Sequence, residues 1–153
     1  MSPGTARTSL LLALAALAAA ACSDITSSGP DRTPAVVAVE GRVVDPSGTG
    51  VDGAGITVTM HETADCGSAT LREATGPSGP DGRFGALVGL NDTGSDFEAR
   101  EVCLDVLAEP PAARPELGSA EQTGLGAILR RHDGSQPVDS VEVELTLPET
   151  GAG

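Results

Sequence analysis

The chain has 153 residues and a formal net charge of −13, and its nine basic residues are all arginine. This charge repels phosphate backbones and anionic lipid headgroups, which argues against nucleic-acid binding and against electrostatic docking to membranes. With two Phe, no Trp and no Tyr, the core has to be built from Val, Leu, Ile and Ala, which bury less apolar area per residue than aromatic rings do.

The N-terminus has the layout of a secretory signal. Arg7 and the free amine make a positive start, residues 10–21 form an apolar run of 12, and three alanines stand directly before Cys22. Such a run is too short to span a bilayer as a helix. It resembles a bacterial lipoprotein signal, which implies that Cys22 carries lipid as the first residue of the mature protein. An ordinary secretory signal with a cysteine nearby is the alternative.

A tether and one domain are expected after the signal of residues 1–21. Residues 22–35 are rich in Ser, Thr and Pro and have almost nothing to bury, which predicts a flexible tether. Residues 36–148 carry strand patterns and form the expected domain, and residues 149–153 are expected to be a disordered tail. We therefore expect a domain outside the cytoplasm, held at the cell envelope by its N-terminal lipid. Ser23 after the lipidated cysteine favours the outer membrane if the cell has two membranes.

The cysteine count favours one disulfide. If Cys22 carries lipid, Cys66 and Cys103 remain as a pair in an oxidising compartment, where disulfides persist. Closing a loop of this length would contribute roughly 3–4 kcal/mol in the chain-entropy account. Two buried thiols or a metal pair are the alternatives. Because no His stands beside either cysteine and no second Cys-x-x-Cys is present, the pair makes a poor zinc site, and no metal site is expected.

Alternating apolar residues predict two strands on either side of a turn. Val39 and Val43 share one parity in the first strand, and Ile56 and Val58 repeat the pattern in the second. Residues 45–48 supply a proline with a fixed φ and a glycine that tolerates positive φ, so the chain can reverse there. We expect these two strands to form a hairpin.

Five further segments are expected to complete the sheet: residues 70–75, 83–90, 98–108, 125–131 and 138–147. Within residues 98–108, Val102 and Leu104 face the inferred core, whereas Cys103 points away from it. Its disulfide would therefore hold the loop of Cys66 across the outer face. Seven short strands and no convincing helix predict an all-β fold, a seven-stranded antiparallel sandwich of two sheets.

These residues resemble the carboxypeptidase regulatory-like family. One family pattern, a Val-x-Gly-x-Val strand, an Asp and Gly turn, a Gly-Ala step and a second strand, is matched by Val39, Gly41, Val43, Asp45, Gly48, Gly53, Ala54, Ile56 and Val58. A second, a Thr followed by Asp-Gly-x-Phe, is matched by Thr75 and residues 81–84, with extra Gly and Pro between them. The resemblance covers residues 36 to 148 and implies a transthyretin-like (prealbumin-like) sandwich with an accessory role and no reaction.

No residue pattern indicates catalysis or a cofactor. Residues 61–65 begin like a His-Glu-x-x-His zinc motif but lack the second His, so a polar loop is the expected reading. No Gly-x-Ser-x-Gly elbow marks a nucleophile. Asp92, Asp96, Glu98 and Glu101 could gather around Ca²⁺, although their spacing fits no EF-hand loop.

The expected function is that of a non-catalytic, lipid-anchored envelope module that binds another envelope protein or a glycan. One alternative is an accessory subunit of an envelope peptidase or of a glycan-processing enzyme. A calcium-dependent adhesive domain is the other. Trp and Tyr, on which sugar rings normally stack, are absent from the chain.

Overall fold

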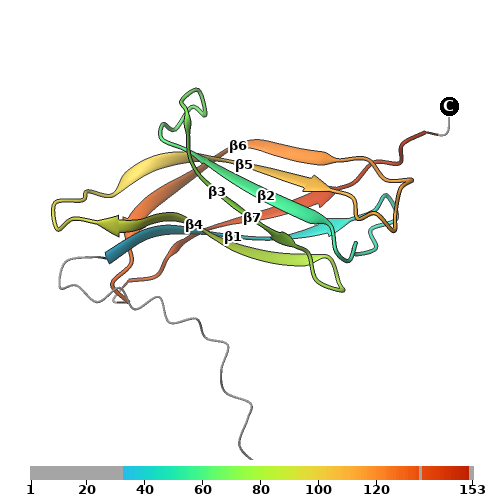
Figure 1. The fold of residues 1–153 in the computed structure, drawn as a ribbon, viewed down its shortest axis with the longest axis horizontal. Coiled ribbons are helices and arrows are strands. Elements are labelled where there is room, and N and C mark those ends of the chain that lie inside the picture. The colour runs from blue at the N-terminus through green and yellow to red at the C-terminus, as the bar shows by residue number, and fades with distance from the viewer. Residues whose placement is uncertain (1–32, 135, 152–153) are drawn as a thin grey trace, which may run out of the picture.

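Among the residues that the computed structural model describes, 33–134 and 136–151, the chain forms seven strands and no helix. For residue 92 only the backbone is described. In chain order the strands are β1 (Thr33–Val44), β2 (Gly55–His61), β3 (Thr70–Pro77), β4 (Arg83–Thr93), β5 (Arg100–Glu109), β6 (Ala120–Arg131) and β7 (Asp139–Thr146) (Figure 1). The all-β class and the seven strands are confirmed. The signal, Cys22 and nearly all of the tether lie outside the described residues.

The strands form one hydrogen-bonded sheet in the order β3-β2-β5-β6-β1-β4, with β7 also on β1. One edge of β1 pairs with β4. The other edge pairs first with the end of β6, where Ala35 lies opposite Arg131, and then with β7 along residues 37–44. β1 therefore joins β4 and β7 to the β3-β2-β5-β6 group, and the sheet is nearly closed around one core (Figure 1).

The predicted hairpin between β1 and β2 is wrong. The turn itself forms, because Gly48 N–H donates to the carbonyl of Asp45 at 2.9 Å and Val44 bridges to Gly50. After the turn, however, the chain crosses to the other strand group, where β2 pairs with β3 and β5. Both β1 and β2 have one apolar face, and placing them in different groups lets both faces enter the same core.

β7 runs parallel to β1. The expectation of an antiparallel arrangement holds for the other five pairings and is wrong for this one. The cause is the route of the chain: β6 is antiparallel to β1, and the turn over residues 132–138 reverses the direction again. A strand that follows β6 onto the same edge of β1 must then run parallel to it.

The core is aliphatic, as the composition predicts. Strand residues of one parity are at most 7 % exposed, among them Val37, Val39, Val58, Leu104 and Leu129. Neither phenylalanine is fully buried, and both pack against the edge of this core.

The ends of the described chain are tied to the fold. β1 begins at Thr33, three residues earlier than the pattern predicts, and Thr93 donates its hydroxyl hydrogen to the carbonyl of Thr33 at 2.5 Å. At the C-terminus, Glu149 bridges to Leu117 and the N–H of Thr150 donates to the carbonyl of Glu116 at 2.8 Å. None of the described residues forms a helix that is long and apolar enough to cross a membrane.

Candidate functional site

Three chemically active side chains share the outer face of β2 and β5. In β5, Leu104 faces the core, so Cys103 and Asp105 on either side of it point outward. His61, the last residue of β2, lies directly opposite Cys103 in the antiparallel register. Because paired residues on antiparallel strands project from the same face, His61 joins the other two there.

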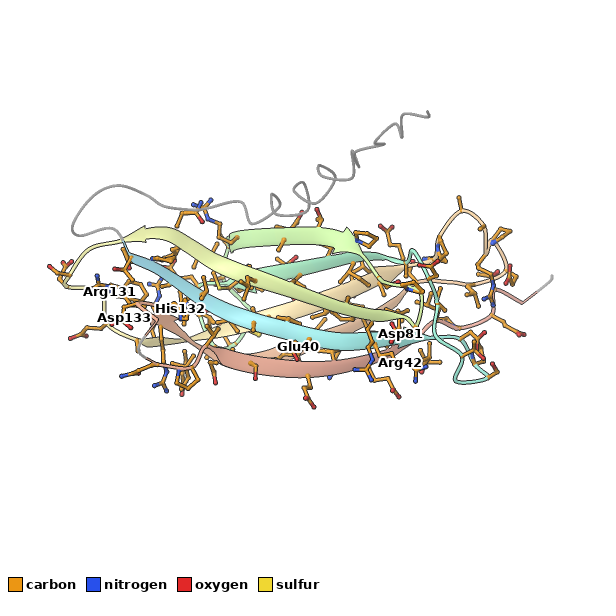
Figure 2. The ribbon with its side chains drawn as sticks, turned by 90° about the horizontal axis from the view of Figure 1, so that it is seen from below. Glu40, Arg42, Asp81, Arg131, His132 and Asp133 are labelled. Carbon is orange, nitrogen blue, oxygen red and sulfur yellow. A yellow bond between two sulfur atoms is a disulfide. The ribbon has the colours of Figure 1, made fainter. Side chains whose placement is uncertain are left out.

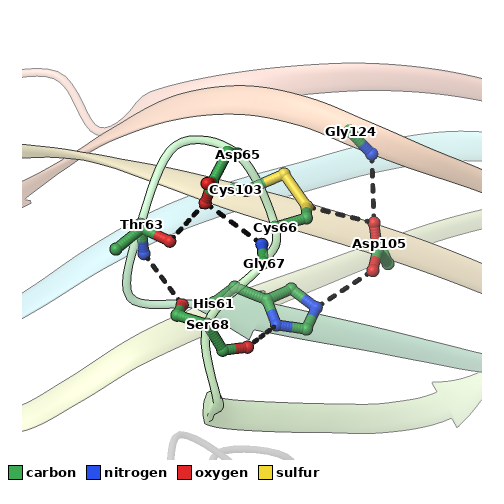
Figure 3. A network of polar contacts seen from close by, with 9 residues as sticks. All are labelled: His61, Thr63, Asp65, Cys66, Gly67, Ser68, Cys103, Asp105 and Gly124. Atoms are coloured by element: carbon green, nitrogen blue, oxygen red, sulfur yellow. Dashed lines mark hydrogen bonds and ion pairs between the residues drawn. A yellow bond between two sulfur atoms is a disulfide. The ribbon is translucent and has the colours of Figure 1, made fainter.

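The loop over residues 62–69, here called the disulfide loop, closes over this patch. Cys66 in the loop is bonded to Cys103, with their Cα atoms 5.1 Å apart, which confirms the expected disulfide. Cys103 points away from the core as predicted, yet it is fully buried because the loop covers it. The disulfide therefore fixes a polar loop onto β5 (Figure 3).

Hydrogen bonds within the disulfide loop fix its shape. Oδ1 of Asp65 accepts the hydroxyl of Thr63 at 2.6 Å and the N–H of Gly67 at 3.1 Å. These donors, the Thr63 hydroxyl first, lower the pKa of Asp65 below its ordinary value. The N–H of Thr63 in turn donates to Oγ of Ser68 at 3.1 Å. The loop thus holds Cys66 in a positive-φ conformation of 55° above the strand.

His61 is held from both sides of its ring. Nδ1 lies 3.1 Å from the carbonyl oxygen of Ser68, and Nε2 lies 2.9 Å from Oδ2 of Asp105. The other carboxylate oxygen, Oδ1, accepts the N–H of Gly124 at 3.0 Å and lies 3.3 Å from Sγ of Cys66 (Figure 3). We call His61, Cys66, Cys103 and Asp105 the His61 cluster. The side chains of its imidazole and its carboxylate are only 13 % and 22 % exposed.

The His61 cluster is not arranged as a hydrolase triad. Both ring nitrogens of His61 face acceptors, a carbonyl and a carboxylate, and neither faces a hydroxyl or a thiol. Glu62, which a His-Glu-x-x-His motif would use as its base, forms an exposed ion pair with Arg100 at 3.4 Å. The expected polar-loop reading of residues 62–65 agrees with this placement.

The sequence did not predict that His61 and Asp105 belong with the cysteines. Asp105 is two residues beyond Cys103 and so shares its face, a signal that the strand pattern already contained. His61 is 42 positions away from Cys103, and only the β2–β5 register brings them together.

Of the residues that were considered for calcium, Asp96, Glu98 and Glu101 do not form a group of three possible ligands, and the side chain of Asp92 is not described. Within the described part of the chain, the one such group is His61, Cys66 and Asp105.

A second surface lies on the outer face of β4, β1 and β7. A shallow groove of about 600 Å³ crosses it near the end of β1. Its lining includes Glu40, Arg42, Arg83, Glu142 and Glu144. Arg42 reaches past the strand end and donates from Nε to the carbonyl of Asp81 at 3.1 Å (Figure 2).

Leu87 lies further along the same face. It is 66 % exposed and is the one large apolar side chain exposed among the described residues. Its neighbour across the strands on β1 is Ala38, which in turn pairs with Ser140 of β7. Glu40 and Glu142 form the next row. We call Ala38, Glu40, Leu87, Ser140 and Glu142 the Leu87 face: a flat surface with an apolar centre and an acidic side.

The comparisons with known proteins find distant structural likeness. No family model matches the chain, and no curated protein matches it. The major plantain pollen allergen Pla l 1 is similar over 77 % of this chain and 97 % of its own, at 14 % identity and a TM-score of 0.43. The 3-chlorocatechol 1,2-dioxygenase of Rhodococcus opacus 1CP is similar over 79 % of this chain and 62 % of its own, at 12 % identity and the same TM-score.

Proposed function

We propose that the chain is a non-catalytic binding module of the cell envelope, anchored by lipid on Cys22, which recognises another envelope protein through the Leu87 face. The module is a transthyretin-like sandwich of the carboxypeptidase regulatory-like kind. It uses no cofactor and carries out no reaction.

The observation that carries this proposal is the exposure of Leu87. Single exposed apolar residues are common on protein surfaces, but this one stands among small residues, with Ala38 and Ser140 in its row and glycines at 85 and 89 on its own strand. Nothing overhangs it, so a partner can approach the sheet closely. An apolar centre beside charged residues is the usual anatomy of a protein interface.

The acidic side of the face indicates the chemistry of the partner. Glu40 and Glu142 are both exposed and lie side by side on β1 and β7. Like charges in adjacent positions of a sheet repel each other, and a basic side chain placed between them relieves that repulsion. With the net charge of −13, this favours a partner that presents a cationic surface with an apolar residue. A glycan is less favoured because the chain has no Trp or Tyr for stacking.

The fold assignment is supported by contact between the two patterns that carry the family resemblance. Gly41 of the first pattern lies opposite Phe84 of the second in the β1–β4 register. Val43 N–H donates to the carbonyl of Gly82 at 2.8 Å. A side chain at residue 41 would collide with the Phe84 ring, which explains why Gly accompanies an Asp-Gly-x-Phe segment here.

The test is photo-crosslinking in intact cells. A photoreactive amino acid at position 87 of the full-length chain should capture one dominant protein, identified by mass spectrometry after detergent washing. The matched position is Glu73, exposed on β3 at the other end of the strand order, where that product should be absent. Equal capture of many proteins at both positions would contradict the proposal. If the dominant product is a peptidase or glycan-processing enzyme, the chain is its accessory subunit.

Anchoring is tested separately. The intact mass of the mature protein extracted from membranes should equal the chain from Cys22 onward plus an acylated glyceryl group. A mass that fits an unmodified Cys22 would remove the lipid anchor from the proposal and leave the Leu87 face untouched.

A further inference from the structure

The His61 cluster has the geometry of a metal site in which a disulfide occupies the place of two thiolate ligands. Metal-binding imidazoles usually donate the hydrogen of one ring nitrogen to a carbonyl or carboxylate, which turns the other nitrogen toward the metal. His61 is held in this way, because its Nδ1–H can donate to the carbonyl of Ser68 at 3.1 Å. Its Nε2 then points at Asp105.

A cation must lie between His61 and Asp105. With its one hydrogen on Nδ1, the neutral ring presents a lone pair at Nε2, only 2.9 Å from the electron-rich Oδ2. Two such atoms repel each other in a partly buried place unless a positive charge lies between them. A proton fills this place in the disulfide form, and a metal ion with suitable ligands can replace it.

The sulfur atoms are close enough to complete a coordination sphere. The ligand atoms of His61, Cys66 and Asp105 all lie within 4.8 Å of one another, and Cys103 is bonded to Cys66. A tetrahedral zinc site places its ligand atoms roughly 3.3–3.8 Å apart. The observed separations of 2.9 Å between nitrogen and oxygen and 3.3 Å between sulfur and oxygen need to change by only a few tenths of an ångström.

We propose that reduction of the Cys66–Cys103 disulfide converts the His61 cluster into a Zn²⁺ site. The ligands are the two thiolates, Nε2 of His61 and Oδ2 of Asp105. The N–H of Gly124 stays on Oδ1 and orients the carboxylate. This mixed sulfur, nitrogen and oxygen set with four ligands is one that zinc prefers.

The exchange is balanced by a dithiol reductant. The dithiol gives two electrons and two protons, its own sulfurs become a disulfide, and the S–S bond of the protein opens to two thiols. Zinc binding then releases both thiol protons and the proton held between His61 and Asp105. The disulfide loop is fixed to β5 in both forms, first by a covalent bond and then by the metal.

The inference does not depend on the proposed function, because the cluster is on β2 and β5, whereas the Leu87 face is on β4, β1 and β7. It also revises the expectation that the two cysteines make a poor zinc pair. That expectation rested on the absence of a neighbouring His in the sequence, and the fold supplies one.

The experiment uses the full chain with Cys22→Ser, so that Cys66 and Cys103 are its only thiols. Zn²⁺ is titrated against a chromogenic chelator, once in the disulfide form and once after reduction by a phosphine without oxygen. We expect one Zn²⁺ per reduced chain, bound about 100-fold or more tightly than by the disulfide form, with release of protons. Co²⁺ in place of Zn²⁺ should give the visible absorption of a tetrahedral ion with thiolate charge-transfer bands.

Variants separate ligands from bystanders. His61→Gln should weaken Zn²⁺ binding by about 10–100-fold or more, whereas His132→Gln, at an exposed histidine after β6, should not change it. Asp105→Asn and the exposed Asp52→Asn form a second matched pair. His61→Cys should restore binding, because a thiolate replaces the imidazole, and a merely structural role for His61 would not give that rescue. Circular dichroism checks that each variant is folded.

Two results would overturn the proposal. One is Zn²⁺ binding by the reduced chain that is no tighter than by the disulfide form. The other is undiminished binding in both His61→Gln and Asp105→Asn, which would mean that the two thiolates alone capture the ion.

Discussion

Oδ2 of Asp45 and Nη2 of Arg114 lie 3.3 Å apart although 69 residues separate them in the sequence. This ion pair joins the turn after β1 to the connection between β5 and β6. Arg114 also binds Glu116, which raises the pKa of the guanidinium further. The other oxygen of Asp45 accepts the hydroxyl of Ser47 at 2.6 Å.

The first prediction is an acid-dependent loss of stability at Asp45. The Ser47 hydroxyl, followed by the Thr49 N–H and Arg114, holds the pKa of Asp45 below its ordinary value of 3.8. A carboxylate with a lowered folded-state pKa stabilises the fold above the unfolded pKa, and that contribution is lost as the pH falls through the folded pKa. Asp45→Asn should therefore be less stable than the wild type at pH 7, and the difference should vanish below pH 3.8.

Urea unfolding at a series of pH values measures this difference. Asp52→Asn, at an exposed aspartate of the same connection, controls for the loss of one negative charge from an acidic protein. A constant difference between Asp45→Asn and the wild type across the acid range would contradict the prediction.

The second prediction concerns the disulfide. Replacing Cys66 and Cys103 by alanine should lower the free energy of unfolding by about 3–4 kcal/mol, since the bridge closes a loop across a separation of 37 residues. Denaturant unfolding with zinc removed by a chelator measures the loss. Reductant should destabilise the wild type and leave the double variant unchanged, so an equal response of both would show that the bridge is not what the reductant acts on.

The third prediction tests the close approach at Gly41. A Cβ at this position would lie 2.6 Å from Cζ of Phe84 and would also meet the carbonyl oxygen of Val143. Gly41→Ala should cost about 1–3 kcal/mol, because the ring and a strand backbone would have to shift. Gly85→Ala, on the neighbouring strand with nothing within 4 Å of the added Cβ, is the control and should leave the melting temperature unchanged or slightly raised. Equal effects of the two substitutions would refute this account.

The fourth prediction concerns a buried hydroxyl. Ser78 is 4 % exposed, and its Oγ donates to the carbonyl of Val51 at 2.6 Å and accepts the N–H of Ala54 at 2.9 Å. Ser78→Ala leaves both backbone groups without this partner and should cost about 1–3 kcal/mol in urea unfolding. Ser140→Ala, at an exposed strand position, should change stability by less than about 0.5 kcal/mol. A Ser78→Ala protein as stable as the wild type would mean that other groups replace both bonds.

Strand positions and faces could be predicted from the sequence, but strand partners could not. The parity of Val39 and Val43 correctly indicates which face of β1 is buried. The same parity is compatible with any neighbour, so it did not reveal that β1 pairs with β4 and β7 and not with β2. Pairing depends on contacts between residues far apart in the chain, which no local pattern encodes.

The same limit applied to the His61 cluster. The outward direction of Cys103 followed from alternation along its strand, and the even number of remaining cysteines led to the bridge. The place of His61 beside Cys103 required the β2–β5 register, and the cover over both required the path of the disulfide loop. A polar residue at a strand end therefore looked like part of a loop.

The parallel pairing of β7 with β1 has a consequence for synthesis of the chain. The first strand to leave the ribosome receives its neighbour along residues 37–44 only when the last strand has been made. Until then the edge of β1 presents unpaired backbone groups beside a row of valines, which is a template for pairing with other chains. A nascent or truncated chain that ends before Asp139 should consequently aggregate, and a chaperone that covers β1 during translation should be most useful to this protein in that interval.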